Sequence, residues 1–361
     1  MNKKAIVAMS GGVDSSVAAF LMQEQGYECI GATMKLFHNE DICLSSSHTC
    51  CSLDDVEDAK NVAFKLGIPH YVFNFTERFK EDVIDAFVAA YENGRTPNPC
   101  IDCNRYLKFE KLLRRAQELE YDYVATGHYA KIEYDAAIGR YLLKRAADKT
   151  KDQSYVLYSM TQAQLAHTQF PLGAMTKTEV RAVAETQDFQ NAKKHDSQDV
   201  CFVPSGHYAD FIEGYTNKTY PQGDFISPDG TVLGRHNGII RYTIGQRKGL
   251  GISADRPLYV SAIDPQANTV TLTEESGLYT KTLTANQVNL IAVSEIKEPL
   301  HITAKIRYRH KDEPATVIQT DNDTIRVTFD TPQRAVTRGQ AVVLYDGDVV
   351  LGGGVICESN E

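Results

Sequence analysis

The chain has 361 residues, which is too long for one ordinary domain and predicts two or three. Apolar residues make up 42% of it, enough for hydrophobic cores, and no uninterrupted apolar run is long enough to span a bilayer. The 38 basic and 47 acidic side chains give a net charge of −9, which excludes a uniformly basic surface for nucleic acids but allows local basic patches. The N-terminal apolar stretch is too short for a signal peptide, so we expect a cytoplasmic protein that does not bind a membrane.

Up to about residue 213, short β-rich runs alternate with amphipathic helical patterns. This alternation predicts a parallel sheet covered by helices on both faces. Ligands of such sheets bind at the carboxyl ends of the strands. In chain order, we expect strands over 5–9, 29–34, 70–74 and 121–126, and helices over 14–25, 54–66, 79–93 and 105–118.

The helical periodicity disappears from Tyr220 onward. Residues 223–268 are rich in glycine, proline and aspartate turns between short strands, and alternating runs at 301–308 and 324–329 predict a small β-barrel. We therefore expect three domains. These are an α/β nucleotide-binding domain over 1–213, a small central β-rich domain over 214–281, and a C-terminal β-barrel over 282–361.

The sharpest motif, Ser10-Gly-Gly-Val-Asp-Ser-Ser16, joins the first strand to the first helix. Its glycines allow a tight bend, so that backbone N–H groups and a helix N-terminus can bind an anion. Asp14 would repel a bare phosphate and therefore implies Mg²⁺ or hydrogen bonds to neighbouring amides. The Gly-Lys-Ser/Thr ending of a P-loop is absent. The motif instead resembles the pyrophosphate loop of enzymes that cleave ATP between the α and β phosphates, the alternative being a glycine turn that only joins strand to helix.

The eight cysteines, in a chain without an export signal, are expected to be thiols, metal ligands or catalysts before structural disulfides. Cys29 and Cys357 fall in predicted strands and are expected to be inert. The spacing of the four candidate zinc ligands that precede the second predicted helix does not match a typical zinc site. A loop that ends in a helix cap is therefore favoured there. These four residues are Cys43, His48, Cys50 and Cys51.

Two cysteines, Cys100 and Cys103, stand immediately before a predicted helix, in a loop that Pro97 and Pro99 hold out of regular structure. A helix N-terminus favours a thiolate, which makes Cys103 a candidate nucleophile. Cys201 lies much later in the chain and, taken alone, is expected to be a core residue.

Seven motifs together resemble one family, the bacterial tRNA-specific 2-thiouridylases (MnmA), in order and nearly end to end. The resemblance implies an adenine nucleotide α-hydrolase-like fold. It also implies ATP-dependent 2-thiolation of the wobble uridine, position 34, of tRNA-Lys, tRNA-Glu and tRNA-Gln, with release of AMP and pyrophosphate. The motifs are Ser10-Gly-Gly-Val-Asp-Ser15, Asn98-Pro-x-x-x-Cys103-Asn, Ala125-Thr-Gly-His-Tyr129, Lys151-Asp-Gln-Ser-Tyr155, Asp196-Ser-Gln-Asp-Val-Cys-Phe202, Tyr242-Thr-Ile-Gly-Gln-Arg-Lys-Gly-Leu250 and Arg307-Tyr308-Arg309.

The resemblance also implies a sulfur chemistry. ATP, with Mg²⁺, would adenylate the C2 oxygen of uracil, which is otherwise a poor leaving group. Cys201 would carry sulfur as a persulfide, received from a cysteine desulfurase directly or through a relay protein. Cys103 would be the nucleophile that frees this sulfur and closes a Cys103–Cys201 disulfide. The implied ATP-binding residues are Ala8, Met9, Ser10, Gly11, Gly12, Val13, Asp14, Ser15, Met34 and Gly127.

The family further implies residues that bind tRNA. A basic stretch on a predicted barrel strand, containing Lys305, Arg307, Arg309, His310 and Lys311, suits phosphate contacts, unless it is only a solvated face. Lys111, Arg114 and Arg115 on a predicted helix could continue this patch. By resemblance, tRNA contacts fall on His128, Lys151, Asp152, Gln153, Arg307, Tyr308 and Gln340, with Asn98, Pro99 and Cys100 around the target base.

Cys100 leaves alternatives open, because some family members carry an acid at its position. Together with Cys103 and Cys201 it could hold a [4Fe–4S] cluster with one open iron, or it could simply line the base pocket. The persulfide scheme is preferred. Two further readings are a ligase that releases pyrophosphate without using sulfur, such as a lysidine- or argininosuccinate-forming enzyme, and a noncatalytic nucleotide- or RNA-binding module.

Overall fold

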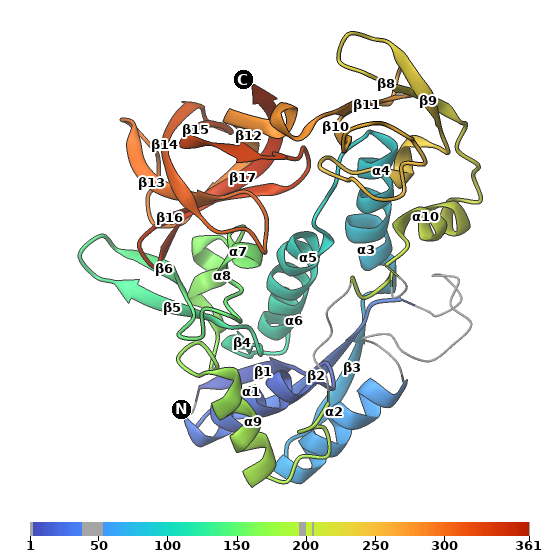
Figure 1. Ribbon diagram of the computed structural model, residues 1–361. Coiled ribbons are helices and arrows are strands. Elements are labelled where there is room, and N and C mark those ends of the chain that lie inside the picture. Colours follow the sequence, from blue (N-terminus) through green and yellow to red (C-terminus); the bar gives the residue numbers. More distant parts are fainter. Residues whose placement is uncertain (1–2, 38–52, 195–199, 204–205, 361) are drawn as a thin grey trace. The chain divides into compact units, whose positions relative to one another are not determined.

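The computed structural model describes residues 3–37, 53–194, 200–203 and 206–360 (Figure 1). The four candidate zinc residues and the motif residues 196–199 lie outside this range. The chain forms two compact units. The first consists of Met1–Val83, Cys100–Pro204 and Asp348–Leu351, and the second of Ile84–Pro99, Ser205–Gly347 and Gly352–Glu361.

The first unit contains the expected parallel sheet. Its strand order is β3-β2-β1-β4-β7, and all neighbouring strands run parallel. The carboxyl ends of these strands therefore meet at one edge, where a nucleotide site is expected. The strands are β1 (Lys4–Ala8), β2 (Glu28–Lys35), β3 (His70–Asn74), β4 (Tyr123–Ala125) and β7 (Thr168–Gln169).

Helices cover both faces of this sheet (Figure 1). Because side chains alternate along a strand, Ala5 and Val7 of β1 point to one face and Ile6 to the other. The first face packs against α1 (Val13–Glu24), α2 (Leu53–Leu66) and α9 (Lys177–Thr186). The second packs against α6 (Leu112–Glu118). The predicted α/β class is confirmed.

Two helical segments between β3 and β4 contain π-helical turns. One comprises α3 (Thr76–Phe79), η1 (Lys80–Asp85) and α4 (Ala86–Glu92). The other comprises α5 (Pro99–Asp102), η2 (Cys103–Lys111) and α6. The second begins at Pro99, six residues before the expected start, because proline is well suited to the first helical position. Cys100 and Cys103 therefore lie inside a helix, and the prediction of a loop there was wrong.

Short elements complete the first unit. The hairpin of β5 (Ala130–Asp135) and β6 (Arg140–Arg145) precedes α7 (Ser154–Leu157) and α8 (Gln162–Ala166). Asp348–Leu351 counts with this unit because Val349 and Val350 pair with Lys144 and Leu143 of β6.

The second unit contains the β-rich part of the chain. After α10 (Tyr208–Thr216), a sheet of order β10-β11-β8-β9 packs around edge-to-face contacts of Phe225 with His236 and Tyr242. Its elements are β8 (Gly223–Ile226), β9 (Val232–His236), the 3₁₀ turn η3 (Ile239–Arg241), β10 (Tyr259–Asp264) and β11 (Thr269–Thr273).

The expected C-terminal barrel is confirmed. Among the described residues, six strands close in the order β12-β15-β14-β13-β16-β17, and β17 pairs back onto β12. The basic stretch from Arg307 to Lys311 lies between β13 and β14 and not on a strand, because β13 ends at Lys305. The elements are η4 (Glu275–Leu278), β12 (Tyr279–Leu290), β13 (Leu300–Lys305), β14 (Glu313–Asp321), β15 (Thr324–Arg334), β16 (Ala341–Asp346) and β17 (Val349–Asn360).

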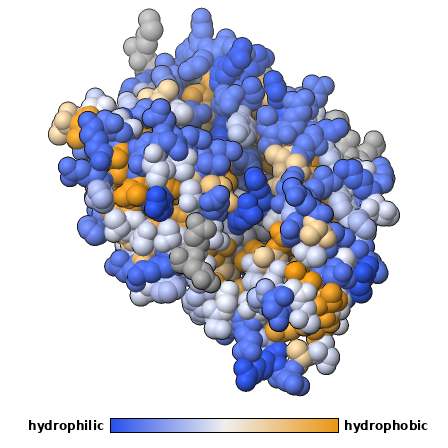
Figure 2. Space-filling model, turned by 90° about the horizontal axis from the view of Figure 1, so that it is seen from above, coloured by the Kyte–Doolittle hydropathy of each residue, from blue (hydrophilic) through white to orange (hydrophobic). Residues whose placement is uncertain are grey.

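The face shown in Figure 2 is mostly hydrophilic, with hydrophobic residues scattered between the polar ones. Within the described ranges, no helix combines the length and the apolar character needed to cross a membrane.

The close approach of Gly11 to α2 generates the first testable prediction. A Cβ atom at Gly11 would lie 2.3 Å from the carbonyl oxygen of Asp55, and Gly11 has a φ of +74°. Gly11→Ala adds a clash to a left-handed backbone, so we expect it to lower the free energy of unfolding by about 2 kcal/mol or more. Gly67→Ala is the control, because Gly67 also has a positive φ but nothing within 4 Å of the added Cβ. Equal shifts of the urea midpoint would contradict the packing argument.

Candidate functional site

The loop between β1 and α1 presents backbone donors at the carboxyl edge of the sheet. Gly12 caps α1, and within the described residues no side chain caps that end. The carbonyl of Gly12 instead accepts hydrogen bonds from Ser15 Oγ at 2.9 Å and Ser16 Oγ at 3.1 Å. The first N–H groups of the helix are left for an anion, as the motif predicts.

Asp14 is neutralised by a lysine that the sequence did not reveal. Its two carboxylate oxygens accept hydrogen bonds from Lys177 Nζ at 2.7 and 2.8 Å, and Tyr129 OH donates to Oδ1 at 2.8 Å. The protein thus supplies a cation for this carboxylate in addition to the Mg²⁺ or amides that we expected. The capping box of Thr176 and Glu179 marks Lys177 as the first residue of a helix, but it does not predict that Lys177 lies beside Asp14.

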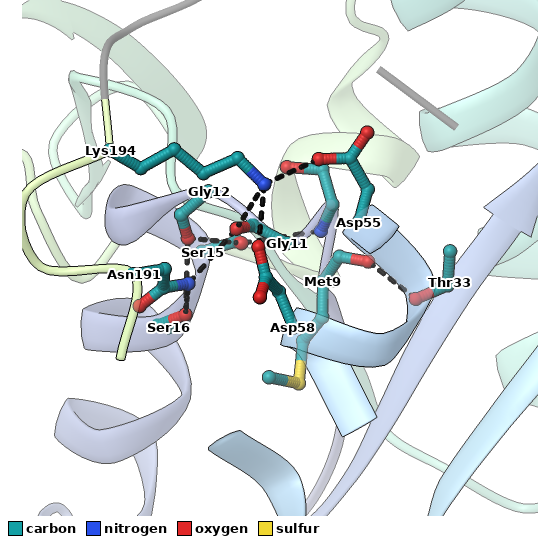
Figure 3. A network of polar contacts seen from close by, with 11 residues as sticks. Met9, Gly11, Gly12, Ser15, Ser16, Thr33, Asp55, Asp58, Asn191 and Lys194 are labelled. Atoms are coloured by element: carbon teal, nitrogen blue, oxygen red, sulfur yellow. Dashed lines mark hydrogen bonds and ion pairs between the residues drawn. The ribbon is translucent and has the colours of Figure 1, made fainter. Parts of the chain in front are cut away.

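A polar network holds the loop from the side of α2 (Figure 3). Lys194 Nζ lies 2.6 Å from both Asp55 Oδ1 and Asp58 Oδ2, and 3.5 Å from the carbonyl oxygen of Gly11. Asn191 Nδ2 donates to the same carbonyl at 2.9 Å. Nothing in the local sequence marks these residues, because they stand more than 170 positions after the loop.

The other expected ATP-binding residues lie at the same edge of the sheet. Ala8 and Met34, from neighbouring strands, pack on the α6 face, whereas Met9 is buried on the opposite face. Gly127 follows β4, and a Cβ there would lie 2.7 Å from the carbonyl carbon of Asp14 and 2.8 Å from Ser15 N. Packing against the loop is therefore reason enough for a glycine at 127.

Cys103 is half-buried and carries a free thiol, whereas Cys100 is exposed. Burial raises the pKa of the Cys103 thiol, Lys108 opposes this shift, and Asp102 adds to it. The resting side chain therefore favours the thiol form, and the role of Cys103 as a nucleophile stays a prediction.

An acidic side chain stands next to Cys103. Burial raises the pKa of Asp102 to about 6, with Arg105 lowering it and Asp82 raising it. Asp102 therefore changes charge just below neutral pH. Its ionised form disfavours the Cys103 thiolate, so the two groups titrate against each other.

His128 is buried between aromatic rings, with Phe109 and Phe170 each 5.8 Å away. Burial, with a contribution from Lys108, holds the pKa of His128 well below its usual range, so the ring is neutral. Lys108 Nζ lies 3.5 Å from Nε2 and Thr126 Oγ1 lies 2.7 Å from Nδ1. Since the ammonium can only donate, Nε2 accepts and Nδ1 carries the proton. The expected contact between His128 and tRNA stays a prediction, and it concerns a ring that is buried in this structure.

Cys201 is half-buried and lies next to an anchored aromatic residue. The buried ring of Phe202 packs on Phe79 at 5.7 Å, and Phe79 packs on Phe37 at 5.8 Å. Phe37 follows β2 and Phe79 follows β3, which brings the Cys201 segment to the carboxyl edge of the sheet. The helix carrying Cys103 passes this edge at Lys108, whose Nζ lies 3.5 Å from Nε2 of His128, just after β4.

Two expected tRNA contacts in the first unit have structural partners. Asp152 is buried, and its Oδ1 accepts from the backbone N–H groups of Ala146 at 3.0 Å and Ser154 at 3.3 Å. Gln153 Oε1 accepts from the N–H of Tyr129 at 2.9 Å. These contacts fix the segment that also carries Lys151.

In the second unit, Gln340 Nε2 donates to the carbonyls of Thr96 at 2.8 Å and Pro97 at 3.2 Å. It therefore holds the chain just before Asn98. Arg307 donates to the carbonyls of residues 334 and 335 at 2.6 and 2.8 Å. Beside it, the Lys305 ammonium lies 5.7 Å from the Tyr308 ring centroid, and Arg309 and Lys311 are exposed.

The helical residues that could extend this basic patch already have acidic neighbours. Arg114 and Arg115 both pair with Glu118, at 3.3 and 3.0 Å, and Lys111 pairs with Glu110 at 3.2 Å. The pairs of Arg114 and Arg115 are exposed and therefore weak, so these two cations stay available to a stronger anion, whereas the Lys111 side chain is half-buried.

The opposing effects of burial and Lys108 on Cys103 generate the second prediction. Lys108→Met removes the cation that opposes burial, so the pKa of Cys103 should rise further. Each pKa unit lowers the thiolate fraction about tenfold. Alkylation of Cys103 by iodoacetamide at pH 8, located by fragmentation of the labelled peptide, should slow accordingly. Lys111→Met, on the same helix, should leave that rate unchanged, and a similar slowing in both variants would contradict the assignment.

Comparison with known proteins identifies the family. Three domain models match the chain: the tRNA methyl transferase HUP domain over residues 3–205, the tRNA methyl transferase PRC-barrel domain over 209–274, and the aminomethyltransferase beta-barrel domain over 280–356. A solved U34-tRNA thiolase, NcsA from Methanococcus maripaludis with its [4Fe–4S] cluster, aligns over 60% of this chain and 72% of its own. It has 19% identity and a TM-score of 0.36, too low to support an argument.

Full-length relatives are far closer in sequence. The tRNA-specific 2-thiouridylase MnmA of Clostridioides difficile strain 630 is 50% identical over 359 residues, covering 99% of both chains. The MnmA of Acetivibrio thermocellus is 51% identical over 355 residues, covering 98% of this chain and 99% of its own. With half of its residues shared along its whole length, this chain belongs to the tRNA-specific 2-thiouridylase (MnmA) family.

Proposed function

We propose that this protein uses ATP to replace the C2 oxygen of the wobble uridine, position 34, of tRNA-Lys, tRNA-Glu and tRNA-Gln with sulfur. The observation that carries the proposal is the pyrophosphate loop at the carboxyl edge of the first unit's sheet, where no described side chain caps the N-terminus of α1 and Lys177 neutralises Asp14. In this proposal, residues 1–213 bind ATP and perform the chemistry, 214–281 form a central domain, and 282–361 bind tRNA.

The first step makes C2 reactive. The C2 oxygen attacks the α-phosphorus of ATP, the uracil N3 proton leaves, and pyrophosphate departs with the electron pair of the broken P–O bond. The N–H groups at the start of α1 and the hydroxyl of Ser10 suit the pyrophosphate, whereas the hydroxyl of Ser15 donates to the carbonyl of Gly12. Lys177 cancels the charge of Asp14, so the loop does not repel the incoming phosphates, and Mg²⁺ enters with ATP as part of the substrate. Met34 and Gly127 would flank the adenosine.

The second step transfers sulfur. The terminal sulfur of a Cys201 persulfide, supplied by a cysteine desulfurase or a relay protein, attacks C2 and displaces AMP. Cys103, once its proton has passed to solvent, attacks Cys201 Sγ as a thiolate. The S–S bond breaks with its electron pair on the sulfur bound to C2, which becomes the thiocarbonyl, and a Cys103–Cys201 disulfide forms. A thiol reductant supplies the two electrons that restore both thiols.

The contacts to tRNA are proposed for the residues that the family resemblance implies. Asn98, Pro99 and Cys100 would surround the target base, and the exposed cations after β13 would contact phosphates. Asp152, Gln153, Gln340 and Arg307 hold backbone segments in this structure, so their effect on tRNA binding would act at least in part through the segments that they fix. Lys151, Tyr308 and the buried His128 complete this set.

A [4Fe–4S] cluster on Cys100, Cys103 and Cys201 is the alternative route for sulfur. Among the described residues, no three His, Cys, Asp or Glu side chains lie close enough together to hold a metal ion. We propose the persulfide route, because Cys103 and Cys201 account for sulfur release without requiring iron, and we propose that Cys100 lines the base pocket.

The third prediction tests the reaction. Incubation of iron-free protein with unmodified tRNA-Glu, MgATP, cysteine and a cysteine desulfurase should yield tRNA that is retarded on a mercury gel. Cys103→Ser and Cys201→Ser should each lose at least about a hundredfold in rate, since each removes a bond-forming sulfur. Cys100→Ala should retain substantial activity.

Other outcomes point to other functions. Thiolation only by iron-loaded, anaerobic protein, abolished by Cys100→Ala, would replace the persulfide by the cluster. Pyrophosphate release without thiolated tRNA would indicate a ligase, and ATP binding without pyrophosphate release would indicate a noncatalytic module.

The fourth prediction tests the tRNA surface. Arg307→Ala would also disturb the backbone at 334–335, so the exposed Arg309 is the better probe. Arg309→Ala should weaken tRNA binding and reduce the slope of log Kd against log salt by about one, as expected for one lost phosphate contact. Lys297→Ala is the control, because Lys297 is an exposed lysine of the same barrel that pairs with Glu295 at 3.0 Å. If Arg309→Ala binds tRNA as tightly as the wild type at every salt concentration, the basic stretch is only a solvated face.

A further inference from the structure

We propose that Asn191 and Lys194 are positioning residues of the pyrophosphate loop, which together hold the Gly11 carbonyl away from the bound phosphates. The inference rests on the proposed function, because it names residues outside the motif on which ATP binding depends. Figure 3 shows both side chains reaching the loop from one segment.

The contacts converge on one oxygen atom. Asn191 Nδ2 lies 2.9 Å from the carbonyl oxygen of Gly11 and 2.9 Å from Ser16 Oγ, and Lys194 Nζ lies 3.5 Å from the same carbonyl. Ser16 Oγ in turn donates to the carbonyl of Gly12 at 3.1 Å. The carbonyls of both loop glycines are therefore held by donors of the protein itself.

The orientation of this carbonyl decides what the loop presents to an anion. In a trans peptide the C=O of Gly11 and the N–H of Gly12 point in opposite directions. Glycine has little intrinsic preference between conformations, so a Gly-Gly peptide can rotate and turn its oxygen toward the ligand. An oxygen facing phosphate is repulsive, whereas an N–H is a donor. Holding the Gly11 carbonyl therefore keeps the Gly12 N–H on the anion side.

The two donors are themselves rigidly mounted. Asn191 is 3% exposed, and its neighbours Phe189 and Ala192 belong to the core under α1 and α9. Arg181 of α9 donates to the carbonyls of Ala192 at 3.0 Å and Lys194 at 3.2 Å, which fixes the backbone of the segment. A donor on a fixed backbone can impose a conformation on a glycine loop.

Lys194 keeps its charge in this position. Burial alone would lower its pKa, but the hydrogen bonds and charges of Asp55 and Asp58 outweigh burial and raise the pKa. The ammonium is thus a permanent donor at the edge of the loop. The same residue stands seven positions before Cys201, so the anchor of the loop also starts the segment that carries sulfur in the proposed reaction.

A purely structural tie between this segment and α2 is the competing explanation, and the chain contains a control for it. Lys65 of α2 donates to the carbonyl of Asp188 at 2.7 Å and to its Oδ2 at 3.0 Å. This contact joins the same two parts of the first unit without touching the loop. Loss of Lys65 should therefore affect stability alone.

The test measures ligand binding directly. The Kd of α,β-methylene-ATP, which cannot be cleaved between its α and β phosphates, is determined with Mg²⁺ by calorimetry, and adenosine serves as a ligand without phosphates. Asn191→Leu has nearly the same size and changes no charge, so its effect cannot be one of charge. We expect the Kd of the analogue to rise on the order of tenfold in Asn191→Leu and in Lys194→Met, as for one lost hydrogen bond. Lys194→Arg keeps a charged donor and should bind the analogue like the wild type. The Kd of adenosine should not change in any of these variants.

Lys65→Met is the control for a purely structural effect. Lys65→Met should lower Tm but keep wild-type affinity for the analogue. Wild-type affinity in both Asn191→Leu and Lys194→Met, or an equal loss in Lys65→Met, would overturn the inference. If Asn191→Leu does not fold, Lys194→Met and Lys194→Arg decide the question, because the Lys194 side chain is 35% exposed. Failure of the wild type to bind the analogue would instead refute the proposed function, and this inference with it.

Discussion

The approach of backbone to backbone around residues 11–15 is the constraint on which the rest of the first unit depends. Gly11 meets the backbone of Asp55 on α2, and Gly127 meets the backbone of Asp14 and Ser15. Neither contact has room for a side chain. The loop is therefore confined between the start of α2 and the segment after β4 before any ligand arrives.

Charge is arranged around this loop in pairs. Lys177 faces Asp14, and Lys194 faces Asp55 and Asp58, so the acids of the motif and of α2 do not stand alone. The helix that begins at Pro99 shows a different balance, where burial works against ionisation of Cys103 and Lys108 works for it. A thiol kept protonated at rest is protected from oxidation, and it becomes a nucleophile only when its surroundings change.

The sequence predicted what is encoded locally. The alternating runs of β1 to β4, the helices between them and the glycine motif all depend on residues close together in the chain. The start of the helix at Pro99 was missed because two prolines were read as a loop signal, although proline suits a first turn. Lys177, Asn191 and Lys194 could not be placed, because only the completed sheet brings them to a loop more than 160 residues earlier. The raised pKa of Cys103 could not be predicted either, because it is due to burial, which depends on packing.

The two units exchange segments, and this has a consequence for synthesis. Residues 84–99 belong to the second unit although the first surrounds them in the chain, and residues 348–351 return to pair with β6 in the first. No contiguous fragment contains one unit whole without segments of the other. The edge of β6 in the first unit therefore stays open until residues 348–351 have left the ribosome. The second unit cannot be complete until the end of β17 has been synthesised, although its first helix, α4, is synthesised much earlier. Emergence of these late segments, and not the order of domains along the chain, sets when either unit can close.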